Sequence, residues 1–523
     1  MSANNNKSVV RLPIVLCLGL ATGLFVGARL DSGPEQGTVT RDVQKLRDVL
    51  RHIEREYVDE VQTDDLTDEA IVHLLSRLDP HSAFIPARER LLANEDLRGN
   101  FDGIGIEFNI FNDTIVVVSP LSGGPSEALG IRSGDKIIEV DGKKVAGIGI
   151  TSNEVMRVLK GPKGTTVDVG IHRNKASEPV YYTITRDKIP QNSVDVAYMV
   201  TEEIGYMKVS RFSATTYDEF IEALDQLKGD GMKKLVLDLQ SNPGGYMNVA
   251  IEMADEFLSE GQSVVFTKGK NRKFNTNAEA TEKGSFETGD LIVLINEGSA
   301  SASEILAGAL QDNDRALIVG RRSFGKGLVQ TPFELSDGSE LRLTISRYFT
   351  PSGRSIQKPY EDEESYAMDI ISRYNQGEFF HADSIKLSDS LKFTTSGGRT
   401  VYGGGGIMPD YFVPLDTTLN SHYLNELYTS TSIQEYAFKY ADDHYKELSE
   451  VGLEAFYRDF KVTDKMVNDL VTIGKRNGVK PGLDELSKKR KLFQTHVKAQ
   501  IARKIWNNEG FYPVFNETNE IFR

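Results

Sequence analysis

The first hundred residues contain two series of apolar residues at helical spacing. The series are Val43, Leu46, Val49, Leu50 and Ile53, and then Ala70, Leu74, Leu75 and Leu78. They predict a small helical unit over residues 40–98, which we interpret as a packing or dimerising element. Within it, the run Leu78-Asp-Pro-His-Ser82 includes a proline that ends a helix, and we interpret His81 as structural.

From Phe101 the pattern changes to short apolar runs separated by glycine turns, which is typical of strands. The expected strands cover residues 103–108, 115–118, 136–140, 167–171 and 181–184, with a helix at 153–159. A β-rich domain is therefore expected over residues 100–187.

Residues 193–413 alternate apolar strands with amphipathic helices, which predicts an α/β core with parallel strands. The expected strands are 205–209, 235–239, 291–295 and 316–319, and the expected helices are 217–227, 248–258 and 304–311. Residues 360–396 are polar and acidic, and we expect an insertion or a solvated loop there. Amphipathic runs beyond residue 415 predict a helical domain over 415–523. The fold class is thus a multidomain α/β (α+β) protein.

The N-terminus carries an apolar run, Leu12 to Ala28, behind Lys7 and Arg11. A basic flank before an apolar segment is the pattern of an export signal, and residues 26–28 offer a cleavage site for a signal peptidase. The run is slightly shorter than the ~20 residues that a spanning helix prefers, yet within the tolerated range. Residues 1–30 are therefore expected to be a signal peptide or a membrane anchor, and both interpretations place the remaining chain outside the cytoplasm.

Length, charge and cysteine content exclude several kinds of partner and site. A chain of 523 residues is too long for one hydrophobic core. Its net charge of −15 argues against nucleic acid as the main partner, because phosphate binding relies on a basic surface. Its single cysteine, Cys17, lies in the apolar run, which excludes a disulfide framework and a cysteine-ligated zinc site. The sequence contains no His-Glu-x-x-His motif, so we expect neither a metal nor a cofactor.

Small residues surround Ser301 in the run Gly298-Ser-Ala-Ser-Ala-Ser-Glu304, between an expected strand and an expected helix. A helix N-terminus presents free N–H groups that can stabilise a developing negative charge. A serine there is more often a cap than a nucleophile. The residues alone do not rank Ser299, Ser301 and Ser303.

Lys326 is the candidate base, because its neighbours Phe324, Gly325, Gly327, Leu328 and Val329 could desolvate an ammonium group. The run Gly320 to Gly327 also matches the nucleotide-binding P-loop pattern except at its last position. There Gly327 replaces the hydroxyl that should hold magnesium, and a strand rather than a helix is expected to follow. Nucleotide binding is the weaker interpretation.

Two resemblances to known families imply functions for these features. The turn Gly103-Ile-Gly-Ile106, the segment from Gly130 and the Asp141-Gly142 turn resemble a PDZ domain. Over residues 40–413 the chain resembles the carboxyl-terminal processing peptidases, or tail-specific proteases, which are serine peptidases with a Ser/Lys dyad. This second resemblance rests on residues 78–82 and on four further motifs, which are Asn242-Pro-Gly-Gly245, Ser299-Ala-Ser-Ala-Ser-Glu304, Gly325-Lys-Gly-Leu-Val-Gln330 and Tyr348-Phe-Thr-Pro-Ser-Gly-Arg354.

The resemblance implies a role for each matching position. Ser301 would be the nucleophile, Lys326 the general base and Gln330 a residue that orients the lysine or the substrate. The backbone N–H groups of Gly245 and Ala302 would form the oxyanion hole. Glu304 is an accessory candidate, although a carboxylate near the lysine favours its charged form, and an acid that complements the helix dipole explains it nearly as well. In the PDZ-like domain, Gly103, Ile104, Gly105 and Ile106 would bind a peptide's terminal carboxylate.

The implied function is a serine endopeptidase that cleaves exported proteins near their C-termini through an acyl-enzyme. Its partners would be protein tails, and the sequence leaves open an adaptor or regulatory protein, a homo-oligomer and attachment to a membrane through an uncleaved N-terminal helix. The alternatives are a catalytically silent PDZ scaffold outside the cytoplasm and a non-peptidase acyl hydrolase.

Overall fold

The computed structural model describes residues 36–111, 113–121, 123–132, 134–173, 178–281, 283–385 and 388–523. The chain divides into two compact units, Met1–Arg77 and Leu78–Arg523. The predicted signal or anchor at residues 1–30 lies outside the described residues. Within those ranges, no helix is both long and apolar enough to cross a membrane.

The first unit consists of two helices in its described part, α2 (Gln36–Glu56) and α3 (Thr63–Ser76). Both fall where the helical spacing of apolar residues predicts them. Val43, Leu46 and Val49 follow one another at three-residue intervals on α2, and each is at least half exposed. Whether this apolar face packs or dimerises stays a prediction.

The β-rich domain contains the expected strands and helix. Its main sheet is antiparallel with the order β3-β4-β5-β7-β8, and a second pair, β2 with β9, joins the two ends of the domain. Buried Ile115, Val117, Ile137 and Val169 fill its core with α6 on one flank. The elements are β2 (Asn100–Gly103), β3 (Ile106–Ile110), β4 (Ile115–Pro120), α5 (Pro125–Ala128), β5 (Lys136–Val140), β6 (Lys143–Lys144), α6 (Ser152–Leu159), β7 (Thr166–His172), β8 (Val180–Thr185) and β9 (Asp187–Pro190).

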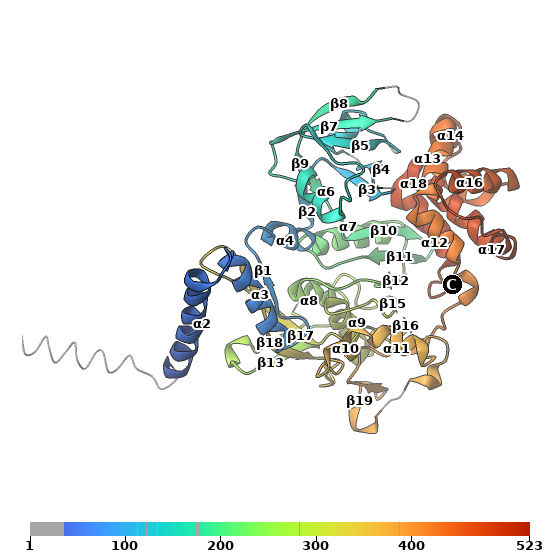
Figure 1. Ribbon diagram of the computed structural model, residues 1–523. Coiled ribbons are helices and arrows are strands. Elements are labelled where there is room, and N and C mark those ends of the chain that lie inside the picture. Colours follow the sequence, from blue (N-terminus) through green and yellow to red (C-terminus); the bar gives the residue numbers. More distant parts are fainter. Residues whose placement is uncertain are drawn as a thin grey trace, which may run out of the picture. The chain divides into compact units, whose positions relative to one another are not determined.

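The α/β core is built on a six-stranded sheet of order β10-β11-β12-β15-β16-β21, parallel except for the β10–β11 pair (Figure 1). The central strands β12, β15 and β16 consist mostly of apolar residues, as expected for strands covered on both faces. The elements are β10 (Val194–Met199), β11 (Ile204–Val209), α7 (Thr216–Gly229), β12 (Lys234–Asp238), α8 (Met247–Asp255), β15 (Asp290–Ile295), α9 (Ala302–Asp312), β16 (Leu317–Gly320) and β21 (Tyr411–Phe412).

A second, antiparallel sheet completes the core, with the order β1-β18-β13-β14 and β17 also paired to β18. It consists of β1 (Ala83–Ile85), β13 (Ser263–Gly269), β14 (Asn277–Glu279), β17 (Leu328–Glu334) and β18 (Glu340–Phe349). Strand β1 follows the Leu78–Ser82 run and was not predicted, because a three-residue strand leaves almost no periodic signal. Helix α4 (Arg90–Arg98) lies between β1 and the β-rich domain in the chain.

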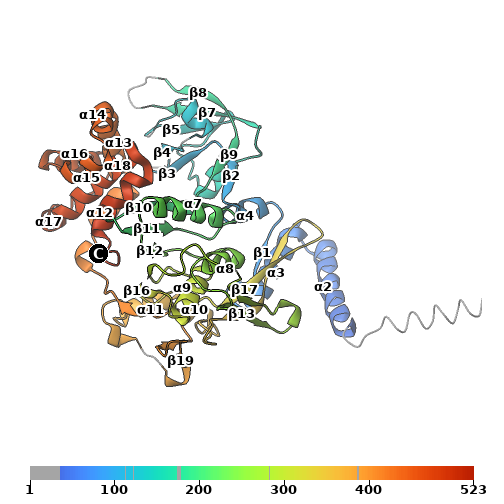
Figure 2. The same ribbon diagram turned by 180° about the vertical axis from the view of Figure 1, so that it is seen from behind.

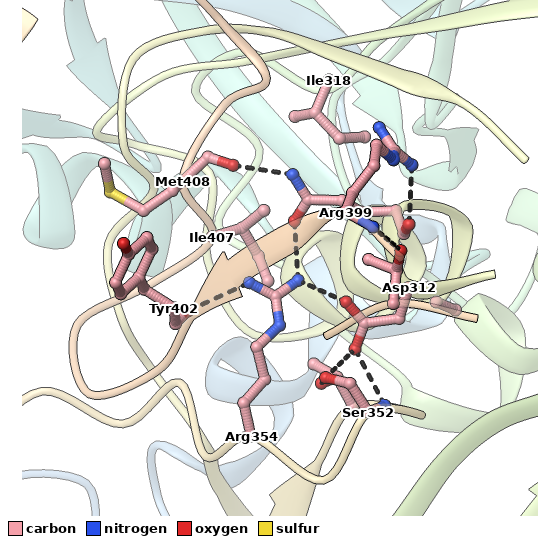
Figure 3. A network of polar contacts seen from close by, with 12 residues as sticks. Asp312, Ile318, Ser352, Arg354, Arg399, Tyr402, Ile407 and Met408 are labelled. Atoms are coloured by element: carbon pink, nitrogen blue, oxygen red, sulfur yellow. Dashed lines mark hydrogen bonds and ion pairs between the residues drawn. The ribbon is translucent and has the colours of Figure 1, made fainter. Parts of the chain in front are cut away.

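Helix α9 is the central helix of the core, and all of its residues are buried. Its C-terminal end is anchored by the polar contacts of Arg354 (Figure 3), and the Arg354 side chain is fully buried. The guanidinium donates to Asp312 Oδ1 at 2.8 Å, to Gln311 Oε1 at 2.6 Å and to the Tyr402 carbonyl at 3.0 Å. Ser352 donates its hydroxyl and its N–H to the other oxygen of Asp312. A cation is thus held at the negative end of the helix dipole.

Of the two alternatives for residues 360–396, the solvated loop is wrong for much of the segment, and the insertion stays a prediction. The segment contains α10 (Glu363–Ala367), α11 (Asp369–Asn375) and β19 (Lys392–Thr394), which pairs with β20 (Thr400–Tyr402) just beyond it. Arg373 and Glu378 are both buried and form an ion pair at 2.8 Å. The polar composition was misleading because these charges are neutralised by partners inside the core.

The C-terminal part is helical as predicted, and its helices gather in one bundle, orange to red in Figure 2. Tyr423, Leu427, Phe456 and Phe493 belong to its hydrophobic core. The helices are α12 (His422–Thr429), α13 (Ser432–Asp443), α14 (Tyr445–Val451), α15 (Leu453–Asp459), α16 (Asp464–Arg476), α17 (Leu483–Lys488) and α18 (Arg490–Phe515), the last with non-helical backbone at Trp506 and Asn507.

Candidate active site

Ser301 lies at the junction between strand β15 and helix α9, as the sequence predicts. It is the N-cap residue of α9 and has backbone angles of φ 55° and ψ −112°. A positive φ is unusual for a residue with a side chain, and such backbone strain persists only where the surroundings enforce it. The turn therefore holds Ser301, half-buried, in a fixed and strained position directly before Ala302, the first residue of the helix.

The other two serines of this turn use their hydroxyl groups for structure. Ser299 is fully buried, donates to the Leu239 carbonyl at 2.7 Å and accepts the N–H of Asn296. Ser303 is also fully buried and donates to the Asn242 carbonyl at 3.0 Å. The structure thus gives a physical distinction among the three serines that the sequence did not supply.

The carboxylate of Glu304 joins the turn at Ser301 to the loop at Lys326. Glu304 is 1% exposed. Its Oε2 atom accepts the N–H groups of Ser301 and Lys326, both at 2.9 Å. Its Oε1 atom accepts the Gly325 N–H at 2.7 Å and the Ser323 hydroxyl at 2.5 Å. Burial raises the pKa of Glu304 to about 7, while these four hydrogen bonds act in the opposite direction.

A second buried side chain, Tyr348, joins the same two residues through their carbonyl groups. Its hydroxyl lies 2.8 Å from the Lys326 carbonyl oxygen and 3.2 Å from that of Ser301. Tyr348 is on β18 and is 1% exposed. Glu304 through N–H groups and Tyr348 through carbonyl groups therefore hold the backbones of Ser301 and Lys326 side by side, although 25 residues separate them in the chain.

Lys326 stands in the loop between β16 and β17 and is half-buried. Burial lowers the pKa of its ammonium group, and the charge of Arg342 lowers it further. The charges of Glu304 and Asp79 act in the opposite direction, but the net shift is downward. The larger neutral fraction is the form that a general base requires.

The glycine loop after β12 packs directly against the Ser301 turn. At Gly244, where φ is 97°, an added Cβ would lie 2.7 Å from the Ser301 Cβ and 2.8 Å from the Ala302 nitrogen. At Gly245 it would lie 2.0 Å from the Phe212 carbonyl oxygen. The N–H groups of Gly245 and Ala302 donate to no acceptor within the described part of the chain. Two backbone donors are thus available near Ser301.

Gln330 lies on β17 and bonds across to β18, where its Nε2 atom donates to Thr344 Oγ1 at 3.2 Å. Thr344 donates in turn to Asp79 of the Leu78–Ser82 run. The sequence alone did not assign a role to Asp79, although Asp79 belongs to the Leu78–Ser82 run, one of the motifs that carry the family resemblance.

His81, interpreted as structural, lies close to the candidate base. Its Nε2 atom is 2.6 Å from the hydroxyl of Tyr366 on α10. Burial, and next the charge of Lys326, lower the pKa of His81 to about 4. The imidazole is therefore neutral at pH 7 and adds no charge to the surroundings of Lys326. Sequence reasoning also missed Tyr366, because it lies in the segment expected to be solvated.

The P-loop alternative for residues 320–327 is not supported by the structure. Leu328 begins strand β17, whereas a P-loop requires a helix there. The N–H groups of Gly325 and Lys326 are bonded to the Glu304 carboxylate and do not face an open phosphate site.

The Gly103–Ile106 turn of the β-rich domain separates β2 from β3. Gly105 has a φ of 70°, and the Ile104 carbonyl accepts both the N–H and the hydroxyl of Ser126. A cavity of about 580 Å³ lies between β2 and the end of α6, and none of residues 103–106 lines it. Its lining combines the apolar side chains of Phe101 and Met156 with several cations and with the acids Glu95 and Asp102, and Lys160 forms an ion pair with Glu95. The cations of this lining outnumber its acids.

Comparison with known proteins shows the family of the chain and the nature of its β-rich domain. Residues 203–364 match peptidase family S41, and residues 103–182 match a PDZ domain. A carboxy-terminal-processing protease of Bartonella bacilliformis is 37% identical over 415 residues, which cover 78% of this chain and 92% of that protein. The chain belongs to peptidase family S41. It is a serine peptidase homologous to carboxy-terminal-processing proteases, and the predicted PDZ domain is confirmed.

Further similarities of this S41 peptidase are more partial. A probable CtpA-like serine protease of Staphylococcus aureus is 37% identical over 320 residues, which cover 60% of this chain and 62% of that protein. The solved structure of a photosystem II D1 C-terminal processing protease is 31% identical, covers 59% of this chain and 89% of its own and gives a TM-score of 0.35. Residues 423–507, in the helical C-terminal part, match a family of unknown function.

Proposed function

We propose that this S41 peptidase cleaves proteins near their C-termini with Ser301 as nucleophile and Lys326 as general base. The observation that carries the proposal is the double link between the two residues, through Glu304 and through Tyr348. The other two serines of this turn, Ser299 and Ser303, have buried hydroxyl groups that donate hydrogen bonds to backbone carbonyl groups. This favours Ser301 as the nucleophile.

In the proposed reaction, neutral Lys326 takes the proton of the Ser301 hydroxyl while the serine oxygen attacks the substrate carbonyl. The oxyanion that forms accepts hydrogen bonds from the N–H groups of Gly245 and Ala302. The tetrahedral intermediate collapses, and the lysine ammonium gives its proton to the leaving amine. Water, deprotonated by the same lysine, then hydrolyses the acyl-enzyme. Gln330 orients Lys326 throughout.

The PDZ domain is proposed to select the substrate through its tail. The turn at residues 103–106 would bind the terminal carboxylate with backbone N–H groups, while the tail pairs with the edge of β3. The cavity between β2 and the end of α6 has Phe101 and Met156 in its lining, and these side chains would contact an apolar last residue. We therefore propose protein tails with apolar last residues as the substrate class.

We also propose that the enzyme acts outside the cytoplasm, either secreted or anchored by its N-terminal helix. The support is the sequence of residues 7–28, a basic flank followed by an apolar run. Fractionation of cells, with the molecular mass of the mature protein, tests both the compartment and the cleavage.

The function is tested with the full-length protein and an unfolded substrate in two forms, one ending in a free carboxylate and one in an amide, with products identified by mass. We expect cleavage of the free-tail form and much slower cleavage of the amidated form. Ser301→Ala and Lys326→Arg should each abolish turnover, since an arginine keeps the charge but cannot act as a base. Lys268→Ala, at an exposed lysine on β13, is the control and should cleave normally. Activity retained by Ser301→Ala would reject the dyad, and binding without turnover by the wild type would favour the silent scaffold.

A further inference from the structure

Asp79 begins a chain of hydrogen bonds that runs through Thr344 to Gln330. Asp79 is 9% exposed, and its Oδ1 atom accepts the N–H groups of His81 and Ser82, both at 2.8 Å. The same atom accepts the hydroxyl of Thr344 at 3.0 Å, and Oδ2 accepts the Ser82 hydroxyl at 2.6 Å. Burial alone would raise the pKa of Asp79, but these hydrogen bonds outweigh it and lower the pKa. Asp79 is therefore a carboxylate at neutral pH.

The charge state of Asp79 fixes the direction of every bond in the chain. A carboxylate only accepts hydrogen bonds, so the single proton of the Thr344 hydroxyl points to Asp79. Thr344 Oγ1 then has only lone pairs to offer to Gln330. The Gln330 amide must consequently turn its NH₂ group toward Thr344, as the 3.2 Å contact from Nε2 has it.

This orientation leaves the amide oxygen of Gln330 as the unused end of the side chain. Oε1 accepts no hydrogen bond from any residue that the structure describes. Gln330 is directly opposite Thr344 in the β17–β18 register, and the register shifts between Val329 and Gln330. A β-bulge at such a place changes the direction of the following side chain. Lys326 is four residues earlier, in the loop that leads into β17.

We propose that Asp79 and Thr344 are positioning residues, which fix the Gln330 amide so that its oxygen accepts a hydrogen bond from the Lys326 side chain. The proposal rests on the proposed role of Lys326 as the base. A neutral amine has two N–H bonds and one lone pair. Holding one N–H on Gln330 limits rotation of the amine and keeps the lone pair available for the Ser301 proton. The Leu78–Ser82 run thereby acquires a role in the proposed reaction although it does not touch the substrate.

Thr344→Val and Thr344→Ser form the matched pair that tests this chain in the full-length protein. Valine keeps the shape of threonine but removes the hydroxyl, whereas serine keeps the hydroxyl. We expect Thr344→Val to lower kcat about tenfold with KM changed less than twofold, and Thr344→Ser to stay within about threefold of the wild type. Should the valine variant fail to fold, Thr344→Ala takes its place.

A double-mutant cycle separates positioning through Gln330 from a general structural effect. In a Gln330→Ala background, Thr344→Val should cost less than twofold, because the residue that it positions is gone. An equal loss of kcat in both backgrounds would overturn the proposal.

The pKa of Lys326 gives a readout that does not require turnover. An acceptor bound to the lysine favours its charged form, so loss of the fixed Gln330 oxygen should lower the pKa. The pH dependence of Lys326 acylation by an amine-selective reagent, followed by mass spectrometry, should shift to lower pH in Thr344→Val and not in Thr344→Ser. An unshifted profile would contradict the positioning role. Absence of cleavage by the wild type would instead contradict the proposed function, and the acylation profile would still decide the role of Thr344.

Discussion

The two ends of helix α9 each bury a charged side chain but use it in different ways. At the C-terminal end, Arg354 pairs with Asp312, and the same arginine also binds Gln311 and a carbonyl group (Figure 3). At the N-terminal end, no cation among the described residues forms an ion pair with the Glu304 carboxylate. It is held by three backbone N–H groups and one hydroxyl.

This difference separates a structural anchor from a chemical site. The Arg354–Asp312 pair neutralises itself and fastens the helix to the loop that follows β18. Glu304 instead fastens the two segments that carry the proposed nucleophile and the proposed base, and both of these residues are half-buried. Changes at the N-terminal end should therefore affect the chemistry, and changes at the C-terminal end should affect only stability.

Replacing the N-terminal carboxylate should have the largest effect on activity. In Glu304→Gln, the NH₂ group must face two hydrogen-bond donors, because all four partners of the carboxylate donate. The loops of Ser301 and Lys326 then separate, and a displacement of about 1 Å can cost about 100-fold in rate. We expect kcat to fall at least about 100-fold in a peptide-cleavage assay.

Glu297→Gln is the matched control, because it makes the same substitution in the same turn, at a carboxylate that binds Arg321. It should keep kcat within about threefold of the wild type. Equal losses in the two variants would show that the turn is merely sensitive to substitution and that Glu304 has no special part in joining the two loops.

Replacing the C-terminal cation should affect stability and not the rate of the folded enzyme. Arg354→Met leaves the Asp312 carboxylate buried without its partner, which costs about 3–5 kcal/mol in the free energy of unfolding. Arg399→Met removes a more exposed arginine of the same network, 33% exposed, and should cost about 1 kcal/mol or less. Urea denaturation measures both, and kcat per active site should stay within about threefold. A tenfold loss of kcat in folded Arg354→Met would break the distinction between the two ends.

A smaller effect is expected in the pH dependence of stability. The pKa of Glu304 is raised to about 7 in the folded state, from about 4.5 when unfolded. A raised carboxyl pKa means that its contribution to stability is present below pH 4.5 and is lost as the pH rises through about 7. The wild-type free energy of unfolding, minus that of Glu304→Gln, should therefore fall between pH 4.5 and 7. A difference that does not change with pH would contradict the burial of an ionisable group at this position.

Most of the fold could be predicted from the sequence, because the core strands are short apolar runs and the PDZ strands are bounded by glycine turns. The sequence was also sufficient for the position of Ser301 between a strand and a helix. It could not show the contacts of Glu304 and Tyr348, because the loop at Lys326 is about twenty residues away from each along the chain and no local pattern reports such a contact.

Two further features could not be predicted from the sequence, for related reasons. Strand β1 pairs with β18 across more than 250 residues, so the Leu78–Ser82 run was interpreted without its partner Thr344. Arg373 and Glu378 were assigned to a solvated loop because composition does not show which charges have buried partners. The roles of Ser301, Lys326, Gln330, Gly245 and Ala302 stay predictions that rest on resemblance and now also on geometry.

The central claim is that Ser301, and not Ser299 or Ser303, is the nucleophile activated by Lys326. Reaction of the full-length protein with an irreversible serine-reactive reagent, followed by peptide mapping, tests it most directly. We predict a single label on Ser301, no label in Ser301→Ala and strongly reduced labelling in Lys326→Arg. A label on Ser299 or Ser303, or labelling at Ser301 that does not depend on Lys326, would contradict the account.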